Sequence, residues 1–548
     1  MSVDPILPQS RIDDMQRHGW WQNKTLLEYF EAALRERPEA IAVVDLRTAT
    51  GVKNSLSFAA LNDKATRIAL ALVHYGIGKQ DVVSFQLPNW WEFVVVNIAC
   101  LKIGAVSNPL MPIFRQRELS YMVDFAESKV MIIPSVFRGF DHEAMLAELR
   151  PQLPKLQHVF VVGGTGDNNF EQALIDPPWE DQMDADRIFA ERAPAANDVI
   201  ELMYTSGTTG TPKGVMHASN ALGFSIRTFI ERIHMTDDDV MYMGSPLAHQ
   251  TGFLYGLWIS IAAKTKLVLQ DQWQAETAWR LIDEEQATCT MGATPFLADL
   301  THSPVAARHN SKRFRLFICG GAPVPRNLAQ EAAERLQIDL MTVWGMTECG
   351  VITSTLLDDP PEKTFQTDGI IYPGCALRLV DEHDNDVPLG TEGRVLQQSP
   401  SSFLGYLKRP EAYGRYDGDY FDTGDLAKLD HDGYIRITGR SKDIIIRGGE
   451  NIPIVEIENV LYEHPATIDV AVVAMPDERL GELGCCFITL QPGRRLSFED
   501  MKEFLSERKV AKSYWPEHLE IIAEMPRTAS GKIQKFQLRE MAKTVRDN

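Results

Sequence analysis

The chain has 548 residues, with a hydrophobic fraction of 44% and a charged fraction of 24%, as in an ordinary soluble globular protein. This length exceeds what one hydrophobic core supports, so two or more domains are expected. The formal net charge of -20 argues against nucleic-acid binding and against attachment to an anionic membrane surface.

The cysteines and the chain start indicate the compartment. Seven cysteines are scattered without a spacing that suits zinc, and an odd number fits a reducing compartment better than a disulfide framework. The first residues, MSVDPILPQSRIDD, lack the basic region and apolar core of a signal peptide. The best candidate membrane span, residues 93–106, contains Asn97 and Lys102, so no integral membrane segment is expected. These features predict a cytoplasmic protein.

Strand-like apolar runs alternate with amphipathic helical stretches through most of the chain. In chain order the strand–helix pairs are DVVSFQLP (81–88) with WWEFVVVNIACLKIG, KVMIIPS (129–135) with HEAMLAELRPQL, TKLVLQ (265–270) with AETAWRLIDEEQ, and FRLFICGG (314–321) with PRNLAQEAAERL. This alternation predicts an α/β architecture with largely parallel sheets.

A loop of small polar residues, TSGTTGTPKG (205–214), follows the apolar run DVIELMY (198–204). Its glycines let backbone N–H groups converge on an anion, and Lys213 adds a positive charge. A helix is predicted from about Ser219, and strand, glycine loop and helix are the usual elements of a phosphate cradle. A Walker A loop is excluded, because a proline precedes Lys213 and a glycine follows it. On local chemistry alone, a plain polar surface loop remains open.

The sequence changes character from about residue 370. Short strands with Gly/Asp turns (ALRLVD, GRVLQQ, DLAKLDHDGYIRITG) indicate a β-rich subdomain. After Lys442 a compact α+β pattern follows, with IVEIENVLYEHP and FEDMKEFLSERK as helices and DVAVVAMPD as a strand. The charged turn GRSKD lies between the two patterns. We therefore expect an N-terminal domain over 1–439, a hinge over 440–442 and a C-terminal domain over 443–548.

Five motifs in order carry a family resemblance. They are TSGTTGTPKG, VWGMTE (343–348), YFDTGD (420–425), TGRSKDIIIRGGENI (438–452) and PRTASGKIQK (526–535). As a set they resemble the adenylate-forming superfamily over roughly residues 27–535. PLAHQTGFLYG, GATPFLADL, IIIRGGENI and KVAKSYWPE are most similar to bacterial short- or medium-chain fatty-acid–CoA ligases and cyclohexanecarboxylate–CoA ligases.

The resemblance implies both a fold and a reaction. The fold is a large N-terminal adenylate-forming domain, with two αβ-layered subdomains and a β-rich subdomain, and a small mobile α+β C-terminal domain. The reaction uses ATP and Mg²⁺ to adenylate a carboxylic acid and then passes the acyl group to coenzyme A. The chemistry fits, because a carboxylate resists attack until it is linked to AMP, and the gathered negative charge needs positioned donors and cations.

Within the resemblance, four residues are assigned to catalysis. Lys532 matches the lysine that reaches across the domain cleft to the carboxylate and the α-phosphate. Thr347 and Glu348 match the positions at the α-phosphate and Mg²⁺, and Glu348 is the implied metal ligand. His249 is placed at the mouth of the acid pocket, although a structural histidine is an equal reading. Taken alone, a lysine near a chain end usually has no specific role.

The resemblance also implies the positions that bind nucleotide. Asp425 matches the carboxylate that binds both ribose hydroxyls. Many relatives have tyrosine where this chain has Trp344, so stacking is expected to survive while a phenolic hydrogen bond is lost. The pyrophosphate positions are Thr205, Ser206, Gly207, Thr208, Thr209, Gly210 and Lys213. The positions at adenine and in the turn beyond it are Gly320, Gly321, Ala322, Pro323, Trp344, Gly345 and Met346.

The second half-reaction is assigned to the segment after the β-rich region. Arg440 is implied on the nucleotide side of the hinge, and Lys442 is the residue whose torsions change. In RGGEN (Arg447, Gly448, Gly449 and Glu450), the glycines permit close approach of a pantetheine arm, and Gly449 matches a tunnel-lining position. A plain β-turn is the alternative reading.

Three other functions fit the sequence less well than an acid–CoA ligase. A P-loop ATPase lacks its motif here, and a nonenzymatic nucleotide sensor would not retain the catalytic side chains. An amino-acid adenylating enzyme usually has an Asp in the PLAHQTGF segment, where this chain has His249. Phe253 and Phe296 favour a short- to medium-chain or alicyclic acid such as cyclohexanecarboxylate, with aromatic acids second. Monomer and homodimer are both left open.

Overall fold

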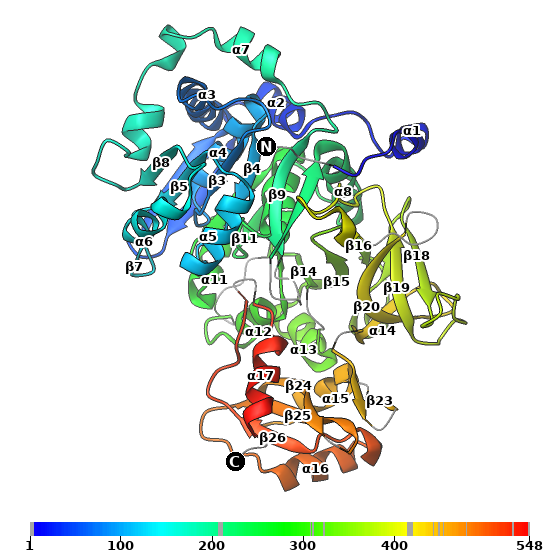
Figure 1. Cartoon of the computed structure of the whole chain (residues 1–548). Helices are drawn as coiled ribbons and strands as arrows, with labels where there is room; N and C mark the ends of the chain where they lie inside the picture. Colours follow the sequence, from blue (N-terminus) through cyan, green and yellow to red (C-terminus); the bar gives the residue numbers. More distant parts are fainter. Residues whose placement is uncertain are drawn as a thin grey trace.

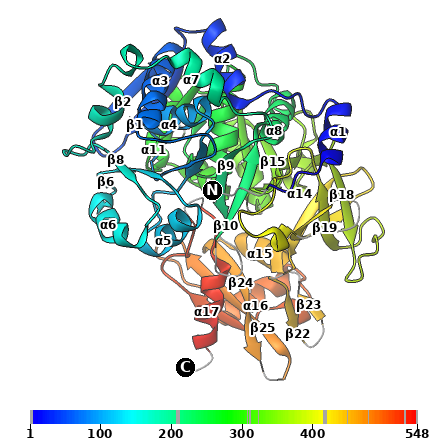
Figure 2. The same ribbon diagram turned by 45° about the horizontal axis from the view of Figure 1, so that its top comes forward.

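The structure is a computed structural model of the chain. It describes residues 5–205, 212–306, 308, 312–321, 324–413, 420–441, 443–447, 450–452, 454–477, 479–528 and 531–545. A large N-terminal part contains three major sheets, and a small C-terminal part (orange to red in Figure 1) contains one. Figure 2, turned by 45°, shows the small part at the same end of the molecule.

The largest sheet has nine strands in the order β17-β16-β15-β14-β13-β11-β12-β1-β2. Its middle strands pair in parallel, and the antiparallel partners lie toward the edges. The bounds are β1 Ile41–Arg47, β2 Val52–Ser57, β11 Val240–Met243, β12 Lys266–Gln270, β13 Cys289–Gly292, β14 Leu316–Gly320, β15 Asp339–Met346, β16 Gly350–Ser354 and β17 Ile370–Ile371.

A second sheet has six strands in the order β10-β9-β4-β3-β5-β8. Its central strands β3, β4 and β5 are buried at every position, and β5 accordingly has a continuous apolar sequence rather than an alternating one. The bounds are β3 Val82–Phe85, β4 Val106–Pro109, β5 Val130–Pro134, β8 His158–Val162, β9 Val199–Thr205 and β10 Lys213–Ala218. A short hairpin joins β6 Val136–Phe137 to β7 Phe140–Asp141.

Helices cover the faces of the two large sheets. The bounds are α1 Gln9–Arg17, α2 Leu26–Glu36, α3 Phe58–His74, α4 Trp91–Lys102, α5 Gln116–Phe125, α6 His142–Leu149, α7 Ala185–Arg192, α8 Ser219–Arg232, α9 Gln250–Gly252, α10 Ile259–Ala262, α11 Ala275–Glu284, α12 Thr294–His302, α13 Arg326–Leu336 and α14 Pro361–Gln366. Short helical turns are η1 Arg150–Gln152, η2 Glu171–Ile175, η3 Trp179–Asp181, η4 Phe253–Trp258 and η5 Pro410–Tyr413.

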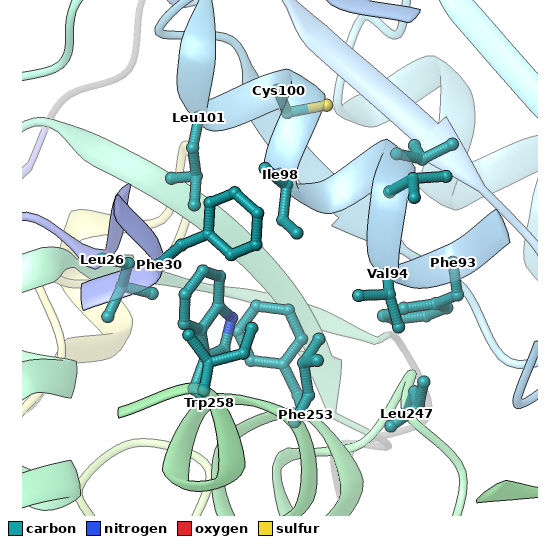
Figure 3. Packing of buried hydrophobic residues seen from close by; sticks show 14 of the residues in the cluster. Leu26, Phe30, Phe93, Val94, Ile98, Cys100, Leu101, Leu247, Phe253 and Trp258 are labelled. Atoms are coloured by element: carbon teal, nitrogen blue, oxygen red, sulfur yellow. The ribbon is translucent and has the colours of Figure 1, made fainter. Parts of the chain in front are cut away.

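The main hydrophobic core lies where α2, α4 and η4 meet. Helix α4 is buried along its whole length, so it has no polar face and packs against neighbours on all sides. Figure 3 shows Phe30 of α2 and Ile98 of α4 close to Trp258 and Phe253 of η4. Thr25 caps α2 with a capping box, which satisfies backbone N–H groups at the start of that helix. This core joins the layers that support the site.

Two smaller sheets complete the fold. The β-rich region is a four-stranded sheet of β18 Ala376–Val380, β19 Gly393–Gln398, β20 Phe421–Leu429 and β21 Ile435–Arg440. The C-terminal sheet contains β22 Ile445–Arg447, β23 Glu450–Ile452, β24 Thr467–Asp477, β25 Gly481–Leu490 and β26 His518–Ile521. Its helices are α15 Ile454–Tyr462, α16 Phe498–Glu507 and α17 Lys535–Val545, with the turn η7 Lys512–Tyr514.

The expected α/β class, with a β-rich region and a small α+β C-terminal part, is confirmed. The helix expected from about Ser219 is confirmed, because α8 begins at that residue. Before it, residues 213–218 form β10, a strand that was not expected, which pairs antiparallel with β9. β10 is buried on both faces after its first residue.

In the part of the chain that the structure describes, none of the helices combines the length and apolar character needed to cross a bilayer.

Candidate active site

Lys532 lies on a tight hairpin of the C-terminal part. Arg527 pairs with Ile533 across the hairpin. The backbone N–H of Gly531 donates to the carbonyl of Thr528 at 2.9 Å, and the N–H of Lys532 donates to the Thr528 hydroxyl at 3.0 Å. Gly531 has a φ of +87°, which glycine adopts without strain. The hairpin therefore fixes the backbone from which the Lys532 side chain projects.

The hairpin packs against the N-terminal part. A Cβ placed on Gly531 would lie 3.5 Å from Cγ of Pro295 and 3.6 Å from Cε2 of Phe296, both on α12, which lies beside the C-terminal part in Figure 1. A Cβ on Gly321 would lie 3.1 Å from Cε of Lys532 and 3.6 Å from its Nζ. The lysine thus crosses between the two parts and lies against Gly321.

The electrostatics of Lys532 identify its other neighbours. Burial and the positive charge of Arg440 lower the pKa of Lys532 to about 8, while the carboxylates of Asp425 and Glu348 raise it. Burial and Lys532 also lower the pKa of His249 to about 3. Residues from five separate segments of the chain therefore share one electrostatic environment.

Asp425 is a buried carboxylate held by two donors. The indole N–H of Trp344 donates to Oδ2 at 2.9 Å, and Nε of Arg440 donates to Oδ1 at 2.9 Å. Asp425 and Arg440 are also directly paired residues of β20 and β21. Trp344 lacks the phenolic hydroxyl of tyrosine, but its indole N–H forms a hydrogen bond with Asp425 that the sequence alone does not predict.

Glu348 is nearly buried and is oriented from the segment after β19. The hydroxyl of Tyr406 donates to Oε1 of Glu348 at 2.7 Å, and the N–H of Phe403 donates to its backbone carbonyl at 2.7 Å. Among the described residues, no group of three or more His, Cys, Asp or Glu side chains is arranged to hold a metal. The carboxylate of Glu348 is a hard oxygen donor of the type that Mg²⁺ binds.

The two ends of the glycine-rich loop are placed, but the loop tip is not. Thr205 and Lys213 are directly opposite each other in the β9–β10 ladder. Nζ of Lys213 lies 4.7 Å from the ring centroid of Tyr406, so the hairpin base contacts the same tyrosine that orients Glu348. Ser206, Gly207, Thr208, Thr209 and Gly210 lie outside the described residues.

His249 is the N-cap residue of α9. Its Nδ1 accepts the N–H of Thr251 at 3.2 Å, so the neutral ring carries its proton on Nε2. The pKa of about 3 means that the ring is neutral at physiological pH, although it adjoins a cationic lysine.

The remaining nucleotide-side positions lie at the ends of β14 and β15. A side chain on Gly320 would meet Val343, and one on Gly345 would meet the backbone of Gly350 and Val351, so these glycines allow close packing of β14, β15 and β16. Met346 is the last residue of β15. Ala322 and Pro323 lie outside the described residues.

The positions predicted for the thiol side are only partly placed. Arg447 donates to Glu517 and to the carbonyl of Ser513, so its guanidinium is engaged within the C-terminal part. Glu450 begins β23. Lys442, Gly448 and Gly449 lie outside the described residues.

Several residues at the site were missed from the sequence. No sequence motif identifies Tyr406, because its partner Glu348 lies far away along the chain. His217 forms a 2.8 Å hydrogen bond with the carbonyl of Thr347. Glu201 and Gln250 form a buried pair beside it. The available signal was Glu201, a charged residue inside the apolar run DVIELMY.

The comparisons with known proteins cover almost the whole chain. Residues 30–407 match the model of the AMP-binding enzyme family, and residues 456–532 match that of the AMP-binding enzyme C-terminal domain. A medium-chain fatty-acid–CoA ligase of Escherichia coli (strain K12) is 37% identical over 98% of this chain and 94% of its own length.

Two further similarities extend the range of relatives. A salicylyl-CoA synthase / salicylate adenylyltransferase of a Streptomyces species is 30% identical over 99% of this chain and 98% of its own length. The crystal structure of ATP-bound MatB from Rhodopseudomonas palustris superimposes with a TM-score of 0.82 at 26% identity, covering 96% of this chain and all of that chain.

Proposed function

This chain belongs to the AMP-binding enzyme family of acid–CoA ligases, and we propose that it activates a short- or medium-chain or alicyclic carboxylic acid, such as cyclohexanecarboxylate. The acid is adenylated by ATP, and its acyl group is then transferred to CoA with release of AMP. The observation that carries the proposal is the position of Lys532 between the two parts of the chain. Its side chain lies against Gly321 and interacts electrostatically with Asp425, Arg440 and Glu348.

In the first half-reaction, Lys532 supplies positive charge where the carboxylate attacks the α-phosphate. The attack brings two anions together, so a cation at about 4 Å contributes roughly 4 kcal/mol at a near-surface effective dielectric. Asp425, held by Trp344 and Arg440, is proposed to receive the ribose hydroxyls. The hairpin base at Thr205 and Lys213 is proposed to face the departing pyrophosphate.

Mg²⁺ would supply charge neutralisation at the phosphates, and Glu348 would hold it. Tyr406 donates to one carboxylate oxygen of Glu348, which fixes the direction of the carboxyl group, and the other oxygen would be the hard ligand. Thr347 precedes Glu348 in the same turn. The ring of His217 forms a hydrogen bond with the backbone carbonyl of Thr347.

The acid pocket is proposed between three segments, His249 to Phe253, Gly292 to Phe296 and Gly345 to Gly350. The ring of Phe296 packs on Trp273 at 4.5 Å between centroids, and a side chain on Gly350 would meet the hydroxyls of Tyr255 and Ser225. Bulky walls on two sides limit the length of the acid. Apart from Glu348, these segments offer no carboxylate to pair with a substrate ammonium.

A panel of acids tests the substrate class. We expect kcat/KM, measured by pyrophosphate release with and without CoA, to rise from acetate to hexanoate and cyclohexanecarboxylate, because each buried CH₂ contributes about 0.8 kcal/mol. It is expected to fall for palmitate, once the cavity is filled. Best activity on acetate, palmitate or phenylalanine would contradict the proposed pocket.

An aromatic acid is the second candidate. It is supported by the similarity over nearly the whole chain to a protein named for salicylate. In the same panel, benzoate and salicylate distinguish the two, since a flat slot prefers benzoate over cyclohexanecarboxylate and an aliphatic pocket does not.

A further inference from the structure

Glu201 is a fully buried carboxyl in the middle of β9. Its Oε2 accepts a hydrogen bond from Nε2 of Gln250 at 3.0 Å. Its Oε1 has no hydrogen-bond partner among the described residues, and no ion pair to Glu201 occurs among them either. A buried carboxyl with one free oxygen needs a further partner.

His217 is the cross-strand neighbour of Glu201. The two residues are directly opposite in the antiparallel β9–β10 ladder, where facing side chains have Cβ atoms about 5 Å apart. Nε2 of His217 lies 2.8 Å from the carbonyl oxygen of Thr347. A carbonyl oxygen only accepts, so Nε2 carries the proton and Nδ1 is an acceptor. Within the described part of the chain, Nδ1 has no partner.

Gln250 completes the cluster. Because its Nε2 donates to Glu201, its Oε1 is the acceptor end of the amide, and this atom too lacks a partner in the described structure. Three buried atoms therefore lack a hydrogen-bond partner in the described structure. They are Oε1 of Glu201 and two acceptors, Nδ1 of His217 and Oε1 of Gln250. Native proteins satisfy such groups with an internal water where the protein itself supplies no partner.

We propose that one internal water binds between Glu201, His217 and Gln250, and that Glu201 is held as a neutral carboxylic acid. The water accepts the O–H of Glu201 Oε1 and donates its two protons to Nδ1 of His217 and Oε1 of Gln250. Each of the three open atoms then has a hydrogen-bond partner, and three hydrogen bonds are the usual number for a buried water. The resulting chain runs from Gln250 through Glu201 and the water to His217 and the Thr347 carbonyl.

The protonation states agree with this assignment. Burial raises the pKa of Glu201 to about 8 and lowers the pKa of His217 to about 4. Near neutral pH the carboxyl therefore keeps its proton and the imidazole does not take one. An ionised Glu201 would offer only acceptors to the other two acceptors, and the cluster would be unsatisfied.

The hydrogen-bonded chain joins two sides of the site. Gln250 directly follows His249, at the proposed pocket mouth, and Thr347 directly precedes Glu348. Glu201 is therefore a positioning residue, which aligns the acid-side segment with the nucleotide-side turn without contacting either substrate. This role rests on the proposed function, but the water and the neutral carboxyl do not.

Matched variants test the role of Glu201. Glu201→Gln keeps a donor for the water and an acceptor for Gln250, so kcat/KM for pyrophosphate release is expected within about threefold of wild type. Glu201→Leu removes both, and kcat/KM is expected to fall roughly tenfold or more, with KM raised for both ATP and acid. A folded Glu201→Leu enzyme with wild-type kinetics would overturn the positioning role.

Infrared spectroscopy tests the neutral carboxyl without substrate. At pH 7 the wild type is expected to show a C=O stretching band of a protonated carboxyl that Glu201→Gln lacks. Absence of that band in the wild type overturns the proposal, whichever acid the enzyme uses and whether or not Glu201→Leu folds.

Discussion

The protonation state of the Lys532 side chain is expected to make adenylation depend on pH. Its pKa, lowered to about 8 by burial and Arg440, lies well below that of a solvated lysine. The amine is charged below this pH and neutral above it, so the positive charge needed for adenylation is lost as pH rises. We expect kcat/KM for pyrophosphate release to decline above about pH 8. Lys532→Arg keeps its charge, so its decline should shift to higher pH; an unchanged profile would show that another group titrates.

Removing the charge should separate the half-reactions. Lys532→Ala is expected to slow adenylation by roughly a thousandfold, since about 4 kcal/mol of charge stabilisation is lost. Thioester formation from a supplied acyl-adenylate should be largely spared, because the lysine acts on the α-phosphate step only. Equal losses in both assays would contradict this division.

At the scale of elements, the residue that follows β14 is Gly321, and its lack of a side chain leaves room for Lys532. Gly321 has a φ of +84°, and a Cβ there would press on Cε of Lys532. Gly321→Ala is therefore expected to reduce adenylation roughly tenfold through backbone strain and displacement of the lysine. Thioester formation from acyl-adenylate should change little.

Two controls separate the effect of backbone strain from the effect of displacing Lys532. Gly493→Ala imposes a similar positive φ, with no atom within 4 Å of the new Cβ, and should leave activity unchanged. In a Lys532→Ala background, the part of the Gly321→Ala effect that acts through the lysine should disappear. Full additivity of the two losses would show that Gly321 acts independently.

The sequence predicted elements better than the contacts between them. Continuous apolar runs gave β3, β5 and β14, because strands buried on both faces have that pattern. The run KGVMHA was not identified as β10, since a strand that completes a hairpin depends on its partner rather than on its own composition. Motifs singled out Asp425 and Glu348 as candidates. Tyr406 and His217 approach Glu348 and Thr347 only through tertiary folding, which leaves no local sequence pattern.

For the whole molecule, we propose that the two half-reactions use different placements of the C-terminal part. In the structure Lys532 lies against Gly321 of the N-terminal part, and the thiol step is proposed to follow rotation about 440–442. Lys442→Pro restricts φ at the proposed hinge, and Gly449→Leu fills the proposed thiol path. Both are expected to release pyrophosphate without CoA while acyl-CoA output falls at least tenfold. Normal acyl-CoA output from either variant would refute its assigned role.

The seven cysteines bear on the fate of the intermediate. Six are buried and one is partly buried, and none is in a disulfide. Burial raises the pKa of every one of these thiols, including Cys349, the residue after Glu348. An acyl-adenylate is a mixed anhydride that would acylate a thiolate within reach, but a neutral thiol is a poor nucleophile. The enzyme's own thiols are therefore expected to stay unmodified: after incubation with acid and ATP but no CoA, peptide mass mapping should show no acyl adduct on any of the seven cysteines.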